Sequence, residues 1–302
     1  MKAPLPCGRE RIWPAGESCA RRGTPVRSRQ ITRSPGYASA RRFLTARLRP
    51  GALGRSLALG FVVMAVCGVL FAELLEGVLE GEGIAAVDQP VNAAVAARRT
   101  DALTTVFTVL TTMGDVISLL AVAVVVAGFL AWRSARSSRP LWITAVALGG
   151  SQVLVLSIKY LVGRPRPAPA LAVIGEDGYA FPSGHSTASL VTFGILAWLV
   201  ATVATRRLLR ITVWAVAAVL ACGVGLSRLY LGVHYLSDVL AAWALGAGWL
   251  AVVIVSATSA TSLRRRARAA EMSDPAVESA IEFSHGSGGC ALGMKHERPC
   301  GS

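Results

Sequence analysis

The sequence predicts an all-α polytopic membrane protein in which six transmembrane helices form one bundle. Of its 302 residues, 53% are hydrophobic and only 16% are charged. Its mean hydropathy is +0.54, and a soluble domain of this length needs more polar surface. Six long apolar runs contain no charged residue. Helices are the expected spanning form, because a backbone in lipid must satisfy its own hydrogen bonds.

Each apolar run approaches the roughly 20 residues that cross a bilayer as a helix. The runs are Leu57–Ala72, Val116–Trp132, Leu141–Ile158, Ser186–Ala204, Ile211–Leu226 and Val239–Thr258. Segment 100–115 also has one apolar face, and Thr100 is a candidate helix cap. We expect this segment to extend the second spanning helix outward rather than to form a separate interfacial helix.

The composition changes at both ends of the apolar region. Residues 1–55 are rich in Arg, Pro, Gly and Ser and are predicted to be a disordered, basic cytoplasmic extension. The first apolar run begins too far along the chain for a secretory signal, and the translation start is left open. Residues 56–260 form the predicted six-helix domain, and 261–302 are predicted to be a basic, then polar, disordered cytoplasmic tail.

The arginines indicate the orientation of the six helices. The net charge is +14, and arginine clusters occur in the N-terminal segment and after the second, fourth and sixth runs. The positive-inside rule then assigns both termini to the cytoplasm of a multi-pass cell-membrane protein. Because the positive charge lies beside apolar runs, we do not expect nucleic-acid binding. The six cysteines form no CxxC pair, and no metal site is expected.

Three polar clusters fall on the opposite, non-cytoplasmic side: Lys159–Pro167, Phe181–Ser186 and Ser227–Asp238. A single cation at a helix end can simply extend its side chain to water. Several cations converging with two histidines and an aspartate instead indicate a functional site. A bound anion would explain why positive charge lies on this side, because guanidinium groups suit phosphate oxygens.

The second and third clusters suggest particular chemistry. The string Pro182–His185 precedes an apolar helix, whose first N–H groups and positive dipole end can bind an anion. There Gly184 allows close approach, and Ser183 can donate from its hydroxyl. His234 and Asp238 are four residues apart, so on a helix they share a face. The carboxylate could keep one imidazole nitrogen protonated and leave the other free to attack, although a purely structural pair has the same spacing.

Together the clusters resemble the signature of the type 2 phosphatidic acid phosphatase family, KxxxxxxRP, then PSGH, then SRxxxxxHxxxD. The resemblance covers about 57 to 260, and every fixed position is present. These positions are Lys159, Arg166, Pro167, Pro182, Ser183, Gly184, His185, Ser227, Arg228, His234 and Asp238.

The resemblance implies a hydrolase that uses no metal or other cofactor. It makes His234 the nucleophile that forms a phosphohistidine, Asp238 its orienting carboxylate, and His185 the acid and later the base. The implied phosphate-binding residues are Lys159, Arg166, Ser183, Gly184 and Arg228. Arg164 lies outside the pattern, and we interpret it as a charge on the rim of the site. Glu176 and Asp177 either tune that rim or form a turn.

The substrate implied by the resemblance is a lipid phosphate or pyrophosphate on the outer or periplasmic face. The candidates are phosphatidic acid, diacylglycerol pyrophosphate, phosphatidylglycerol phosphate and undecaprenyl pyrophosphate. A vanadium-dependent haloperoxidase shares the signature, but those enzymes are soluble. A non-catalytic lipid transporter or scaffold is the other alternative, although no catalytic residue has been lost. The sequence leaves the particular lipid, the oligomeric state and the role of the tails open.

Overall fold

The computed structural model describes residues 52–134 and 137–272, and within these ranges it is helical and contains no strand. Of the segments predicted to be disordered, 1–55 and 261–302, residues 1–51 and 273–302 lie outside the described ranges, whereas residues 52–55 belong to a helix and do not fit the prediction. The elements in chain order are α2 (Ala52–Glu80), η1 (Gly83–Val87), α3 (Asp88–Ala96), α4 (Asp101–Met113), α5 (Val116–Arg133), α6 (Arg139–Val162), η2 (Pro169–Leu171), α7 (Gly184–Val203), α8 (Arg207–Tyr230) and α9 (Leu236–Met272).

Six of these helices, α2 and α5 to α9, are long and apolar enough to cross a membrane. Each of these six helices contains one of the predicted apolar runs. The single exception is Ala204, the last residue of the fourth run, which follows the end of α7. The prediction of an all-α bundle with six spanning helices is therefore confirmed. Large apolar side chains on the outer faces of the bundle, such as Phe61, Val125 and Val219, are exposed, as expected for helices whose solvent is lipid. Helix α9 continues to Met272, so the first residues of the predicted tail are helical.

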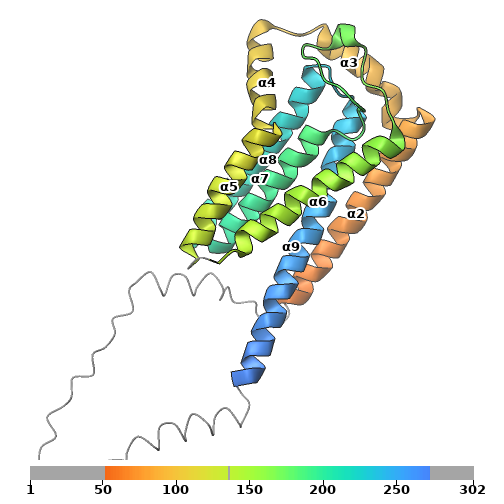
Figure 1. Cartoon of the computed structure of the whole chain (residues 1–302). Helices are drawn as coiled ribbons and strands as arrows, with labels where there is room; N and C mark the ends of the chain where they lie inside the picture. The colour runs from red at the N-terminus through yellow and green to blue at the C-terminus, as the bar shows by residue number, and fades with distance from the viewer. Residues whose placement is uncertain (1–51, 135–136, 273–302) are drawn as a thin grey trace, which may run out of the picture.

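Helix α7 is the centre of the bundle. It contacts α5, α6, α8 and α9. About two-thirds of the residues in its most apolar stretch are buried. Helix α2 lies along α9 at the edge of the bundle (Figure 1). Close approach of α6 and α9 depends on Gly150, where an added Cβ would lie 2.1 Å from the Trp249 ring. The Trp249 indole donates to the Ala147 carbonyl at 2.8 Å, which fixes this contact.

Segment 100–115 does not extend the second spanning helix as expected. Helix α4 is a separate helix. The helical backbone is interrupted at Gly114 and Asp115, and α5 begins at Val116. The Thr100 side chain caps α4 by accepting from the Leu103 N–H at 3.4 Å, as predicted. Helix α4 packs along α8, where Phe107 stacks on Tyr230 with ring centroids 4.3 Å apart. Tertiary packing thus separates the two helices, and the break brings Asp115 to the start of α5.

Candidate active site

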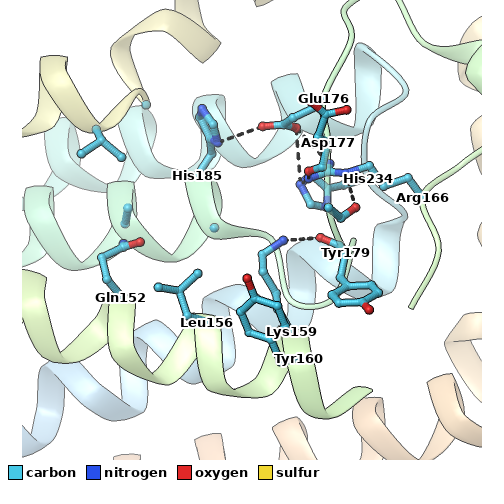
Figure 2. Close-up of a pocket in the computed structure, with 15 residues that line it drawn as sticks. Gln152, Leu156, Lys159, Tyr160, Arg166, Glu176, Asp177, Tyr179, His185 and His234 are labelled. Carbon is cyan, nitrogen blue, oxygen red and sulfur yellow. Dashed lines mark hydrogen bonds and ion pairs between the residues drawn. The ribbon is translucent and has the colours of Figure 1, made fainter. Parts of the chain in front are cut away.

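The three polar clusters meet at one end of the bundle, where α6 ends and α7 and α9 begin (Figures 1 and 2). They surround a cavity of about 340 Å³. The polar part of its lining includes Lys159, Arg166, Glu176, His185 and His234. The three clusters, separated by many residues in the sequence, therefore form one site.

His234 and Asp238 make the predicted pair, but not on one helix. Helix α9 begins at Leu236, so His234 lies in the preceding loop. Its Nδ1 is 3.4 Å from Asp238 Oδ2, and the same oxygen accepts from the Tyr235 N–H at 2.9 Å. Asn92 on α3 donates to the His234 carbonyl at 3.4 Å. His234, only 1% exposed, is thus held at its ring by Asp238 and at its backbone by Asn92.

The surroundings of His234 keep its imidazole neutral. Burial lowers its pKa from 6.5 to about 3; the hydrogen bond to Asp238 opposes this shift, and the charges of Arg228 and Arg166 add to it. Asp238 accepts a hydrogen bond from Nδ1–H, and the unprotonated Nε2 accepts a hydrogen bond from Arg166 Nη1 at 3.3 Å. The unprotonated Nε2 therefore faces the cations, as a nucleophile aimed at a bound anion would.

Two guanidinium groups and two imidazoles enclose a space that we call the anion site: Arg166, Arg228, His185 and His234. The carboxylate of Glu176 occupies it (Figure 2). Its Oε2 accepts from Arg166 Nη1 at 2.9 Å and from Arg228 Nη2, and lies 3.9 Å from His234 Nε2. Its Oε1 lies 3.6 Å from His185 Nδ1. The site therefore holds an anionic group between the guanidinium and imidazole groups.

The sequence predicted that Glu176 either tunes the rim of the site or forms a turn. The structure instead places its carboxylate at the centre of the site. Arg228, which is 1% exposed, also donates from Nη1 to Thr111 Oγ1 at 2.7 Å. Its buried Nε has no hydrogen-bond partner among the described residues. A buried guanidinium N–H is costly to leave unpaired, so the site has capacity for a further acceptor oxygen.

The first residues of α7, Gly184 and His185, line the cavity, whereas Ser183 lies behind them and does not line it. Ser183 is the N-cap of α7 and is fully buried. Its hydroxyl accepts from Ser186 Oγ at 2.9 Å, and its N–H donates to the Asp238 carbonyl at 3.2 Å. At Gly184 an added Cβ would have only one neighbour within 4 Å, at 3.8 Å, so the backbone is open toward the cavity that it lines. Lys159 lines the same cavity and donates to the Tyr179 carbonyl.

Arg164 is not on the rim, so that interpretation was wrong. Its side chain is 13% exposed and joins two buried carboxylates. Nη1 donates to Asp238 Oδ1 at 2.5 Å and to Ser237 Oγ at 2.7 Å, and Nη2 donates to Asp88 Oδ2 at 2.7 Å. The guanidinium also lies over the Tyr235 ring, 4.3 Å from its centroid. Arg164 therefore fixes the carboxylate that orients His234.

Asp88, at the start of α3, was missed by the sequence reasoning. It is 1% exposed and accepts from the Ser237 N–H at 3.0 Å. Its only sequence signal is its position in the acidic stretch after the first apolar run. The structure connects that stretch to the beginning of α9, which explains why a carboxylate can be buried there.

The cavity continues from the charged end into the spanning region. Gln152 and Leu156 on α6, Val116 on α5 and Ala188 on α7 line this part (Figure 2). A ligand with a charged head and an apolar tail matches this change of lining. Within the described residues, no group of three or more His, Cys, Asp or Glu side chains is placed to hold a metal ion.

Six candidate spanning helices with two histidines and a cluster of cations at one end have the arrangement expected for a membrane phosphatase of the PAP2 type. Residues 140–261 match the PAP2 superfamily. This match includes all three polar clusters and, with the two relatives described next, supports the type 2 phosphatidic acid phosphatase family and the activity of a phosphate ester hydrolase.

Two comparisons with individual proteins agree with this assignment. Phosphatidylglycerophosphatase B of Bacillus subtilis (strain 168) is 29% identical over 179 residues, which are 59% of this chain and 86% of the relative. The crystal structure of a transmembrane PAP2 type phosphatidylglycerolphosphate phosphatase from Bacillus subtilis superimposes with a TM-score of 0.57. The two chains are 26% identical, and the match covers 62% of this chain and 93% of the other.

Proposed function

We propose that this membrane phosphatase removes phosphate from a lipid through a phosphohistidine on His234, at the non-cytoplasmic face. The observation that carries the proposal is the Glu176 carboxylate, which is held between two guanidiniums and faces both imidazoles. A phosphoryl group in that position would lie beside a neutral nucleophilic nitrogen and beside a possible proton donor.

In the first step, His234 Nε2 attacks phosphorus and forms an N–P bond as the bond from phosphorus to the leaving oxygen breaks. Asp238 holds Nδ1–H and so stabilises the positive charge that develops on the ring. The leaving oxygen takes a proton from Nδ1 of His185, the nitrogen that faces the anion site.

In the second step, water attacks the phosphohistidine. His185 Nδ1 accepts the proton of the water as the new P–O bond forms. The N–P bond breaks, and its electron pair returns to His234 Nε2. Inorganic phosphate leaves, and both histidines recover their starting protonation states.

The charge of the transferring group would be balanced by Lys159, Arg166 and Arg228. Phosphoryl transfer requires mainly positioning and electrostatic stabilisation, and three fixed cations can supply both. The Ser183 hydroxyl and the Gly184 N–H at the start of α7 add donors. We therefore propose that turnover needs no metal ion.

The proposed face follows from the arginines at the other end of the bundle. Arg133 ends α5, Arg139 begins α6 and Arg207 begins α8, all at the end away from the site. The positive-inside rule assigns that end to the cytoplasm. Among the four candidate lipids, the names of the relatives favour phosphatidylglycerol phosphate, and the partly apolar cavity is consistent with a lipid.

The test is phosphate release by the detergent-purified protein from each of the four lipids, with excess chelator. We expect release that persists in chelator, is fastest with phosphatidylglycerol phosphate and disappears in His234→Ala. Trapping radiolabelled phosphate on the protein, lost in His234→Ala but retained in His185→Ala, which lacks the base for hydrolysis of the phosphohistidine, would identify the intermediate. Folded protein that releases no phosphate from any lipid contradicts the proposal. Halide oxidation with added vanadate would then favour the haloperoxidase alternative, and unchanged cellular function of His234→Ala would favour the scaffold.

A further inference from the structure

A second histidine–carboxylate pair lies beside the anion site. His185 Nε2 is 2.8 Å from Asp115 Oδ1, whereas His185 Nδ1 faces Glu176 Oε1 at 3.6 Å. Because a carboxylate only accepts, Nε2 carries a proton toward Asp115. The two ring nitrogens of His185 therefore point in different directions, one to the Asp115 carboxylate and one to the space that the phosphate would occupy.

Asp115 has an ordinary alternative role, which the structure does not support. It is the N-cap residue of α5, with φ −66° and ψ 147°. Aspartate is favoured there because its side chain accepts from the first N–H groups of the helix. The Asp115 side chain makes no such capping hydrogen bond. Its carboxylate is directed to His185 instead.

The chain around Asp115 is closely fitted to His185. At Gly114 an added Cβ would lie 3.4 Å from His185 Cδ2 and 2.4 Å from Val224 Cγ1. The break between α4 and α5 thus packs directly against the imidazole and α8. Any larger residue at Gly114 would displace the segment that carries the Asp115 carboxylate.

We propose that Asp115 is a positioning residue for His185 in the reaction set out above, on which this inference rests. It accepts Nε2–H and keeps Nδ1 directed at the leaving oxygen. When His185 is protonated on both nitrogens, Asp115 stabilises that charge. When Nδ1 has given its proton to the leaving oxygen, Asp115 still holds Nε2–H, so Nδ1 can accept the proton of the attacking water.

A bound phosphate makes this role more important. The carboxylates that face His185 are Asp115 and Glu176. The phosphate must displace Glu176, because both require the Arg166 and Arg228 donors. Asp115 then remains as the carboxylate partner of His185 at the moment of proton transfer.

The test compares Asp115→Asn on two substrates that differ in their leaving group. One is the best lipid phosphate, whose alkoxide needs a proton to leave. The other is a nitrophenyl phosphate with a long alkyl chain on the ring, whose phenolate leaves without one. For the lipid we expect kcat/KM to fall about 10–100-fold, part of the roughly 10²–10⁴-fold that general acid–base catalysis supplies. For the aryl phosphate kcat/KM should change less than about 3-fold, because it reports only the first step.

The control variants separate this role from a structural one. Asp115→Ser keeps a favoured N-cap residue but removes the carboxylate, and should reproduce the selective loss. Asp101→Asn removes an exposed charge at the far end of α4 and should change neither rate. In a His185→Ala background, Asp115→Asn should have no further effect on the lipid. Equal losses on both substrates, or no loss on the lipid, would overturn the inference. A native protein that hydrolyses neither substrate would instead overturn the proposed function.

Discussion

Replacing Glu176 with glutamine should make the protein bind inorganic phosphate more tightly. In the structure the Glu176 carboxylate occupies the anion site and is hydrogen-bonded to both guanidinium groups that a phosphate would use. An incoming anion must therefore displace a carboxylate before it can bind. Glutamine has nearly the same shape but carries no charge, so its displacement should require less free energy.

The size of the effect follows from the two hydrogen bonds to Arg166 and Arg228. A hydrogen bond to a charged group contributes about 1.5–3 kcal/mol. A bond between a guanidinium and a carboxylate, charged on both sides, lies near the upper end of this range, whereas a bond between a guanidinium and an amide, charged on one side only, lies near the lower end. Replacing a carboxylate by an amide therefore weakens each bond by about 1 kcal/mol, or about 2 kcal/mol for both. The Glu176 side chain is 25% exposed, so water screens part of this difference. We expect the Kd for phosphate to fall roughly 10–30-fold, since a factor of ten corresponds to about 1.4 kcal/mol.

The assay is isothermal titration of inorganic phosphate into the purified protein, which does not depend on turnover. Asp177→Asn is the matched control. It removes the same charge from the same loop, but Asp177 meets Arg166 through its backbone carbonyl, at 3.0 Å. Its Kd should stay within about 3-fold of the native value. A Kd for Glu176→Gln that is unchanged or weaker than native would refute the reasoning, because the carboxylate would then not compete with the phosphate.

Three further predictions concern the support of the site. Arg164→Lys should lower both kcat and the melting temperature, because an ammonium cannot reproduce the hydrogen bonds of the guanidinium to two carboxylates. Each lost hydrogen bond to a charged group costs about 1.5–3 kcal/mol. An unchanged kcat would count against the positioning role of Arg164. Gly232→Ala should destabilise the fold by more than about 2 kcal/mol in thermal unfolding, because Gly232 has φ +76° and an added Cβ would lie 2.2 Å from a backbone oxygen. Gly178→Ala, with φ +81° and open space, should cost only about 1 kcal/mol, and equal losses would contradict the steric explanation. Because burial lowers the pKa of His234 from 6.5 to about 3, the unfolded chain binds a proton that the folded protein excludes, and stability should fall by up to about 1.4 kcal/mol per pH unit below pH 6.5. The apparent melting temperature of His234→Gln should therefore decline less steeply than that of the native protein between pH 7 and pH 4, and parallel declines would show that His234 is not the group responsible.

The sequence predicted the spanning helices well because hydrophobicity alone determines them. A run of apolar residues near bilayer length has few alternatives to a buried or spanning helix. The polar clusters could be identified in the same way, because a charged residue beside a spanning helix is energetically costly and so indicates a functional site. The separation of α4 from α5 was not predictable in this way. It accompanies the packing of α4 against α8, and the apolar pattern of residues 100–115 alone fits a continuous helix, although Gly114 and Asp115 are residues typical of a helix end and a helix start.

The roles of neighbouring arginines could not be read from the sequence either. Arg164 and Arg166 are two residues apart in the same loop, and both follow the end of α6. Arg166 reaches the anion site, whereas Arg164 turns to Asp88 and Asp238. Which one meets a phosphate and which one meets a buried carboxylate depends on the contacts of that loop with α3 and α9. A motif pattern identifies the residues but not these partners.

The charges of the site nevertheless contain a signal that the sequence reasoning did not use. Cations buried this deeply need counter-ions, because an unpaired buried charge is expensive. The acidic residues of the loops at the same end of the bundle were therefore candidates to fold into the site. The carboxylates that do so are Asp88, Asp115, Glu176 and Asp238. Asp88 and Asp238 pair with Arg164, and Asp115 pairs with His185, so these three can keep their partners when a substrate binds. Glu176 pairs with the guanidiniums that a phosphate requires, which makes it the carboxylate that the substrate has to replace.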